Sequence, residues 1–91
     1  MTTASLLETF RAFYAGATFV SVLDDPPVTK ATLGSNAAHV TVRFDGRTGS
    51  VLSLCALDNL GKGAAGQAIQ CANLVLGLPE ATGLPVVGIM P

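Results

Sequence analysis

The sequence predicts an α+β domain, in which a sheet of antiparallel or mixed strands is packed by two helices. Apolar residues recur at helical spacing near the N-terminus, β-branched segments follow, and a second helical pattern comes after them. Of the 91 residues, 49% are hydrophobic and 12% are charged, a balance typical of a globular chain with one core. One small domain, or part of one, is therefore expected.

The first helix is predicted from about Ser5 to Ala15. Ser5-Leu6-Leu7-Glu8 fits a capping box, in which a hydroxyl and a carboxylate satisfy free amide groups at a helix start. Apolar residues then follow at three- and four-residue spacing. Gly16 can adopt the left-handed conformation that ends a helix.

Extended segments come next. The β-branched run at 18–23 stops at two prolines and predicts a short strand, and residues 28–33 predict a further extended piece. Residues 38–45 alternate in the manner of a half-buried strand. One face carries His39, Thr41 and Arg43, and the other carries Val40, Val42 and Phe44. Residues 50–57 are more apolar, so the two segments predict an antiparallel hairpin.

A second helix is predicted from about Gly63 to Leu76. One face is lined by apolar residues at spacings of four, three and four, namely Ala65, Ile69, Ala72 and Leu76. Gly77 supplies a C-terminal cap, and Pro79 prevents continuation. Asp58 is expected to cap the start. The tail at 78–91 is expected to be extended and packed on the surface.

Residues 61–66 spell GxGxxG between a strand and a helix, which is where a dinucleotide fingerprint belongs. That fingerprint needs a following parallel strand with an acid at its end, and the only later apolar run, 84–90, has none. The preceding strand is also the second arm of a hairpin. Two interpretations stay open: the glycines allow close helix–sheet packing, or the helix start offers amide groups to a ligand.

Composition argues against several partners. Five basic and six acidic residues give a net charge of −1, without the basic run that nucleic acid requires. No stretch approaches the ~18 apolar residues of a membrane helix, and the start lacks signal-peptide features, so no membrane partner and a cytoplasmic location are expected. Cys55 and Cys71 lack a zinc-binding or redox spacing. They are expected to be buried structural thiols, and no metal site is predicted.

The stretch from Leu57 to Gln70 closely resembles the end of N-acetyl-γ-glutamyl-phosphate reductases. The resemblance continues through Asn73-Leu74 and Gly77-Leu78-Pro79-Glu80, and upstream through Phe13-Tyr14, Phe19-Val20 and Gly34-Ser35-Asn36. It implies a glyceraldehyde-phosphate dehydrogenase-like architecture, in which a Rossmann domain for NADP is joined to a domain with substrate and dimer contacts. By this resemblance, residues 1–91 are a partial C-terminal domain, and the nucleotide-binding domain is absent.

The family reduces an acyl phosphate to a semialdehyde in arginine biosynthesis, using a nucleophilic cysteine, a histidine base and NADPH. Its Gly-Cys-Tyr-Pro type motif and its histidine region are missing from these residues, so no catalytic residue is predicted and the chain is expected to be inactive alone.

The resemblance also implies site residues. Asn59, Lys62, Gly63 and Gln67 would lie near the nicotinamide end of NADP, with Gln67 foremost because an amide both donates and accepts. Asn36 is either a turn residue or part of the substrate pocket.

Two functions of different classes stay open. The chain is a part of the reductase that acts with the missing half, or it is a non-catalytic remnant domain that forms homo-oligomers or binds related subunits through exposed apolar surface.

Overall fold

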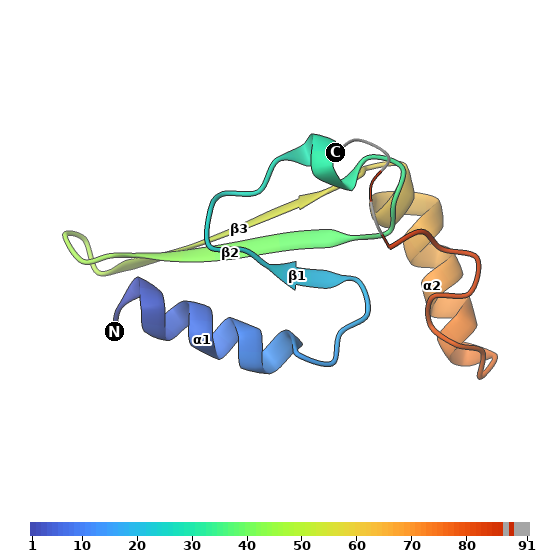
Figure 1. Ribbon diagram of the computed structural model, residues 1–91, viewed down its shortest axis with the longest axis horizontal. Coiled ribbons are helices and arrows are strands. Elements are labelled where there is room, and N and C mark those ends of the chain that lie inside the picture. The colour runs from blue at the N-terminus through green and yellow to red at the C-terminus, as the bar shows by residue number, and fades with distance from the viewer. Residues whose placement is uncertain (87, 89–91) are drawn as a thin grey trace.

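Two α-helices accompany a three-stranded sheet in the computed structural model, which describes residues 1–86 and 88 (Figure 1). In chain order the elements are α1 (Thr3–Tyr14), β1 (Val20–Val22), the 3-10 helix η1 (Thr29–Thr32), β2 (Ala38–Asp45), β3 (Ser50–Leu57), the π-helix η2 (Gly61–Ala65) and α2 (Gly66–Val75). The sheet order is β1-β2-β3, with β1 parallel and β3 antiparallel to β2. The predicted α+β fold with a mixed sheet is confirmed.

The β2–β3 hairpin has the bounds that the sequence predicts. Its turn is closed by the Gly49 amide, which donates to the Asp45 carbonyl at 2.8 Å. Gly49 has φ +72°, a conformation that favours glycine. All eight residues of each strand pair in one continuous register, with Val42 opposite Ser53.

α1 starts two residues earlier than predicted, because a different pair of residues forms its cap. Thr2 Oγ1 accepts from the Ser5 amide and Ser5 Oγ accepts from the Thr2 amide, both at 3.0 Å. The predicted box of Ser5 with Glu8 is therefore wrong. Gly16 is not among the glycines with positive φ, so its predicted left-handed cap is wrong as well.

α1 lies along β1 and β2, where it protects a sheet edge. β1 pairs only with the first residues of β2, up to Val40. Further along β2, the Phe44 amide donates to Thr3 Oγ1 at 3.0 Å. The start of α1 therefore satisfies a backbone group that the short β1 leaves open.

The connection from β1 to β2 differs most from the predictions. The strand predicted at 18–23 is limited to Val20–Val22, and residues 28–33 contain η1 instead of an extended piece. A parallel pair needs a crossover connection. The chain therefore leaves the sheet after Leu23, whose amide still donates to the Val40 carbonyl at 2.7 Å.

β2 is the centre of the core. The buried apolar residues are Leu7, Phe19, Ala37, Ala38, Val42 and Ala56. Thr41, on the face expected to be polar and open, is also fully buried. Its hydroxyl donates to the Leu23 carbonyl at 2.6 Å, and Arg43 donates to the Thr41 oxygen at 3.0 Å. The expected half-burial of β2 is therefore wrong, because the crossover covers its second face.

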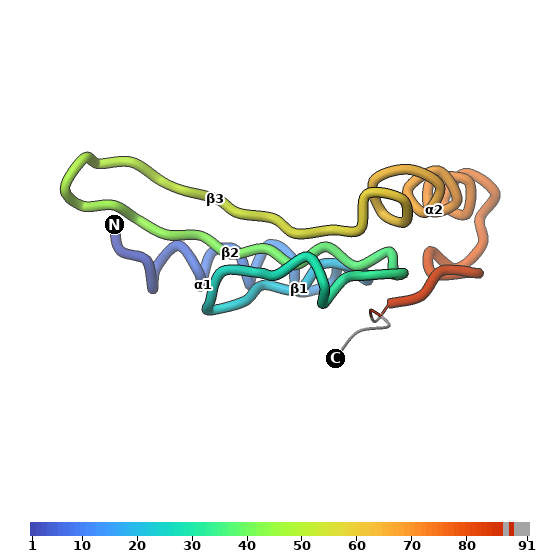
Figure 2. Tube along the Cα trace, turned by 90° about the horizontal axis from the view of Figure 1, so that it is seen from above, coloured from blue at the N-terminus to red at the C-terminus, as the bar shows by residue number. Residues whose placement is uncertain are grey.

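α2 extends from one end of the sheet, opposite the hairpin turn (Figure 2). Its buried residues are Gly66 and Asn73, whereas Ile69 and Leu76, on the predicted apolar face, are 44% and 72% exposed. The apolar face that the spacing indicates is therefore not the face that packs on the domain. Periodicity detects an apolar stripe but not what covers it.

The end of α2 behaves as predicted, whereas the tail forms turns where an extended segment was predicted. Gly77 has φ +74° and the Leu78 amide donates to the Asn73 carbonyl at 2.9 Å, which is a Schellman cap. The tail turns at residues 79–84 and returns to the start of β2, where the Asn36 amide donates to the Pro85 carbonyl at 2.8 Å. Three of the seven residues of the predicted apolar run at 84–90, at positions 87, 89 and 90, lie outside the described residues.

Both cysteines are exposed and free, so their predicted burial is wrong. Cys55 lies on β3, which borders the sheet, and Cys71 lies on the exposed side of α2. Within residues 1–86 and 88, no helix has the length and apolar character needed to cross a membrane.

Candidate functional site

The glycine-rich segment before α2 packs closely on the loop that leads into β2. A Cβ on Gly61 would lie 2.5 Å from the Ser35 carbonyl oxygen, and one on Gly66 would lie 2.6 Å from the Gly61 carbonyl oxygen. Two backbone hydrogen bonds of the π-helical type, each spanning five residues, lie in this segment. The Gly63 amide donates to the Asp58 carbonyl at 3.0 Å, and the Gly66 amide donates to the Gly61 carbonyl. Close packing therefore explains Gly61 and Gly66, although the contact is with a loop and not with the sheet.

A polar cluster joins this segment to the tail. We name it the Gln70 cluster; its members are Thr18, Asn36, Lys62, Gln70 and Glu80. Asn36 Nδ2 donates to Gln70 Oε1 at 2.8 Å, and Lys62 Nζ donates to the same oxygen. Gln70 Nε2 donates to Glu80 Oε2, and the Thr18 hydroxyl donates to Glu80 Oε1 at 3.3 Å. One glutamine thus connects the loop before β2, η2, α2 and the tail.

Lys62 has a second contact within the core. Its ammonium lies 5.2 Å from the centroid of the Phe19 ring, and Phe19 is 3% exposed. A cation at this distance is attracted by the ring face. Lys62 is therefore directed toward the body of the domain, away from the exposed side of η2.

Asn36 is buried, with 1% of its surface exposed. Its Oδ1 has no hydrogen-bond partner among the described residues, and a Cβ on Gly66 would collide with this oxygen. Asn36 thus lies beneath the start of α2, where Gly66 leaves room for it. The structure gives Asn36 a packing role, and its contact with substrate stays a prediction.

The other residues predicted near NADP share an exposed surface. Asn59, Gly63 and Gln67 are exposed and follow one another at four-residue spacing, which places them on one side of the η2–α2 segment. A Cβ on Gly63 would lie 3.2 Å from Asn59 Oδ1. The amide of Gln67 donates to Cys71 Sγ at 3.8 Å. Asn59 and Gln67 therefore present side-chain amides on the same side as Gly63, and Lys62 does not.

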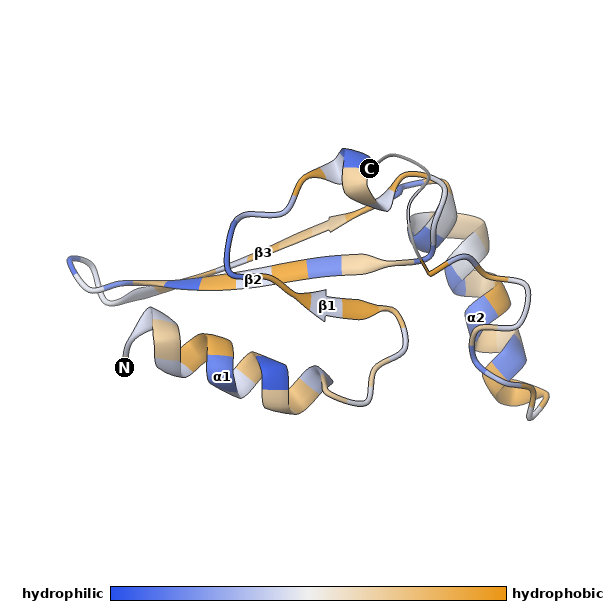
Figure 3. Cartoon of the chain, in the orientation of Figure 1, coloured by the Kyte–Doolittle hydropathy of each residue, from blue (hydrophilic) through white to orange (hydrophobic). Residues whose placement is uncertain are grey.

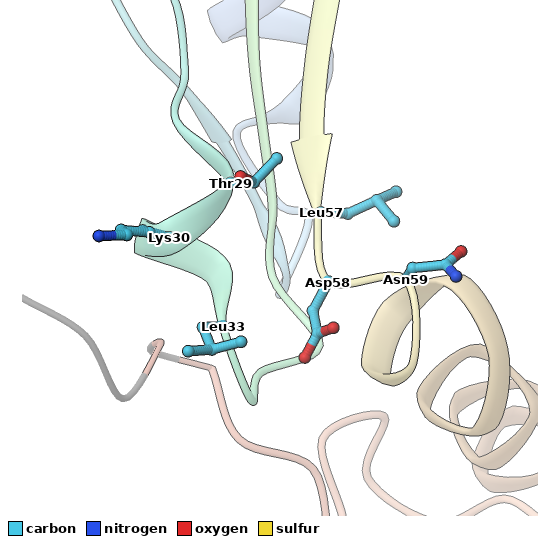
Figure 4. Close-up of a pocket in the computed structure, with 6 residues that line it drawn as sticks. All are labelled: Thr29, Lys30, Leu33, Leu57, Asp58 and Asn59. Atoms are coloured by element: carbon cyan, nitrogen blue, oxygen red, sulfur yellow. The ribbon is translucent and has the colours of Figure 1, made fainter.

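A cavity of about 290 Å³ lies beside this surface, lined by Thr29, Lys30, Leu33, Leu57, Asp58 and Asn59 (Figure 4). The Asp58 carboxylate points toward the turn after Leu33, whereas the Asn59 side chain points the other way. Asp58 Oδ2 accepts from the Gly34 amide at 2.7 Å, and its Oδ1 accepts from the Leu60 amide at 3.2 Å. Asp58 therefore joins two loops, and its predicted cap on the closing helix is wrong, since η2 has no side-chain cap.

Asp58→Ala is expected to lower the free energy of unfolding by about 2 kcal/mol, because the substitution removes a charged acceptor of two backbone amides. Urea denaturation followed by circular dichroism measures the change. Asp45→Ala is the matched control, since Asp45 Oδ1 accepts one amide, from Arg47 at 3.0 Å, in the exposed hairpin turn. Equal losses for the two variants would contradict the role of Asp58 as a loop connector.

The contact between Gln70 and Glu80 was not predicted from the sequence. No local pattern joins them, because the chain reverses at the Gly77 cap before Glu80 meets α2. The described part of the chain contains no group of three His, Cys, Asp or Glu residues that could hold a metal ion.

Residues 1–59 match the family described as semialdehyde dehydrogenase, dimerisation domain. The chain belongs to this family. The segment shared with other semialdehyde dehydrogenase dimerisation domains contains α1 and the whole sheet, and it ends at Asn59, before η2 and α2.

Similarity to particular relatives extends further along the chain. The chain is 58% identical over 89 residues to an N-acetyl-γ-glutamyl-phosphate reductase of Frankia casuarinae, and 58% identical over 87 residues to one of Thermus thermophilus. A reductase of a Bradyrhizobium species is 51% identical over 90 residues. These alignments cover 96%, 96% and 99% of this chain but only 26%, 25% and 28% of the relatives. The predicted resemblance is confirmed, and the chain spans about a quarter of the length of these curated relatives.

Proposed function

We propose that this chain is the C-terminal portion of a cytoplasmic, NADPH-dependent reductase that converts an acyl phosphate to a semialdehyde in arginine biosynthesis. It acts only together with a part that carries the nucleotide-binding domain and the nucleophilic cysteine. The observation that carries the proposal is the 58% identity to named reductases over almost the whole chain, which continues through η2 and α2, beyond the dimerisation-domain match.

In this proposal, the bond-forming and bond-breaking steps take place on the part of the reductase that carries the nucleotide-binding domain and the nucleophilic cysteine. A cysteine thiolate displaces phosphate from the acyl phosphate and forms a thioester, and NADPH supplies the hydride that reduces it. Cys55 and Cys71 lie on different elements, and neither is given a catalytic role in this proposal. The chain's own contribution is to bind and orient.

The exposed surface at Asn59, Gly63 and Gln67 fits one end of the cofactor. Side-chain amides can donate to and accept from the carboxamide of a nicotinamide or a ribose hydroxyl. Lys62 is engaged by Gln70 and Phe19, so this surface suits a neutral polar group better than a phosphate. We accordingly assign the nicotinamide end of NADP to these three residues, with Gln67 foremost, and the pyrophosphate to the nucleotide-binding domain.

The exposed apolar side of α2 supports the need for another part of the protein. Leu74, Val75 and Leu76 are 58%, 84% and 72% exposed, and Gly66–Val75 contains no charged residue. Figure 3 shows the hydrophobic end of this helix outside the sheet region. An apolar surface of this kind typically marks an interaction site.

Reconstitution tests this proposal. The chain alone is expected to show no NADPH oxidation with the acyl phosphate, and activity is expected when a second polypeptide with the nucleotide-binding domain and cysteine is added. In the reconstituted enzyme, Gln67→Ala should lower kcat/KM about tenfold through loss of one hydrogen bond to the cofactor. Thr48→Ala, in the hairpin turn, is the control and should leave kcat/KM unchanged. A folded, bound complex without activity would refute the proposal.

A second candidate function is a non-catalytic module that associates with copies of itself. It is favoured by the family's description as a dimerisation domain and by the exposure of Val51 and Leu52 on β3. Sedimentation equilibrium tests this candidate, because a monomer at every chain concentration would argue against it.

A further inference from the structure

η2 is a π-helix that continues directly into α2, since Ala65 and Gly66 at the junction both have α-helical backbone angles. π-helical turns are rare and occur mostly as single turns inserted into α-helices, frequently at functional sites. A turn of this kind forms less readily than an α-helical turn, so contacts from outside the helix are needed to keep η2 in this form.

The π-helical turn changes which residues share a side of the η2–α2 segment. In a continuous α-helix, residues eight positions apart differ in direction by roughly 80°, since 3.6 residues complete a turn. A π-helical turn holds more residues and takes up most of this difference. Lys62 and Gln70, which are eight positions apart, are joined by a hydrogen bond, and Asn59 and Gln67 have the same separation. One turn therefore aligns the joined pair and the exposed pair.

Gln70 is held from the side of the domain. Its Oε1 accepts from Asn36 Nδ2 at 2.8 Å, and Asn36 is 1% exposed. Its Nε2 donates to Glu80 Oε2. Donors on one side of the Gln70 amide and an acceptor on the other fix its orientation, so Oε1 is directed toward Lys62.

We propose that Gln70 is a positioning residue for the cofactor surface. By accepting from Lys62 across the π-helical turn, it holds η2 in the register that places Asn59 and Gly63 on the side of Gln67. Gln70 acts through Lys62 and not through contact with the cofactor. The inference rests on the proposed function, because that proposal assigns the nicotinamide end of NADP to this surface.

The register of η2 is measured directly on the chain. NMR spectra that correlate an amide with the carbonyl across its hydrogen bond should connect Gly63 to Asp58 and Gly66 to Gly61 in the unmodified chain. Gln70→Met keeps the length of the side chain and removes both polar atoms. In this variant, the two glycine amides should lose these acceptors or take the carbonyls four residues before them.

A second variant removes the other end of the same link. Lys62→Met eliminates the donor to Gln70 Oε1 and should change the acceptors of the glycine amides in the same way. The test therefore does not depend on the folding of one variant, and far-UV circular dichroism verifies that each variant folds.

An exchange of side chains supplies the matched control. Gln70→Glu combined with Glu80→Gln keeps an acceptor for Lys62 and Asn36 at position 70, and the new amide at position 80 donates to it. This double variant should retain the register. Val42→Ala destabilises the chain by another route, through a cavity beneath a residue that is 0% exposed, and should also retain it.

The reconstituted reductase tests the effect on the cofactor. Gln70→Met is expected to raise KM for NADPH about fivefold and to leave KM for the acyl phosphate unchanged. The double exchange should restore KM for NADPH to within about twofold of the unmodified value. Val42→Ala should leave both KM values unchanged, because lower stability alone reduces the amount of folded enzyme and not its affinity for NADPH.

The outcomes separate this inference from the proposed function. Glycine acceptors that stay the same in Gln70→Met and Lys62→Met would overturn the register role. An unchanged KM for NADPH in Gln70→Met, where Gln67→Ala raises it, would overturn the positioning role while the proposed function stands. A bound complex without activity would refute the proposed function and the cofactor role together, and the NMR measurement would still decide whether Gln70 holds η2.

Discussion

Gly66→Ala is expected to lower the free energy of unfolding by about 3 kcal/mol, at the upper end of the range for overpacking. A Cβ at this position would lie 2.6 Å from the Gly61 carbonyl oxygen and 2.8 Å from the Gly61 carbonyl carbon, and it would also collide with Asn36 Oδ1. The Gly61 atoms are backbone, and Asn36 is 1% exposed. Neither neighbour can move without disturbing η2 or the loop before β2.

Gly16→Ala is the control for this substitution. A Cβ on Gly16 has nothing within 4 Å, and Gly16 does not have positive φ. Its replacement should leave the unfolding free energy unchanged or raise it by about 0.5 kcal/mol. Urea denaturation of both variants measures the difference, and a Gly66→Ala protein as stable as Gly16→Ala would contradict the described packing of η2.

Gln70→Ala is expected to lower the free energy of unfolding by about 2 to 3 kcal/mol. The substitution removes the acceptor of Asn36 Nδ2 and Lys62 Nζ and the donor to Glu80. Asn36 Oδ1 already has no partner, so both polar atoms of its buried amide would then be unsatisfied. A buried donor without an acceptor is the main part of this cost.

Gln67→Ala controls for the loss of a glutamine from α2. The Gln67 side chain is exposed and its described hydrogen bond is to Cys71 Sγ at 3.8 Å, so its replacement should change stability by less than about 0.5 kcal/mol. The two variants thus separate stability from cofactor binding. Thermal and urea denaturation of each variant are the measurements, and equal losses of stability would contradict the Gln70 cluster.

The local predictions that hold depend on patterns within a few residues. The alternation at Ala38–Asp45, the apolar run at Ser50–Leu57 and the turn between them predict the hairpin with its observed bounds. Gly77 followed by Pro79 predicts the end of α2, and Gly77 has the required positive φ. Each of these signals acts on the backbone at its own position, so no knowledge of distant contacts is needed.

The predictions that fail concern what covers a surface. Cys71 was predicted to be a buried thiol and Ile69 to lie on an apolar face of α2, yet both are exposed. The side of α2 toward the domain is small and polar, with Gly66, Gln70 and Asn73. The crossover between β1 and β2 likewise contains η1 and buries Thr41 through contacts between distant segments. Burial is decided by packing between distant segments, which a local period does not report.

The candidate site also has features that the sequence predicts and features that depend on contacts between distant segments. Similarity and local spacing are properties of the chain alone, and they predict the family, the hairpin, the two helices and the glycine-rich segment. The folded arrangement is needed to show that Lys62 faces Phe19 and Gln70 and that Asn36 is buried beneath Gly66. It also shows that Asn59, Gly63 and Gln67 share an exposed side. The Gln70 cluster is closed where the tail reverses at Gly77 and brings Glu80 to Gln70. Contacts of this kind join segments that are far apart in the sequence, so they depend on the whole fold.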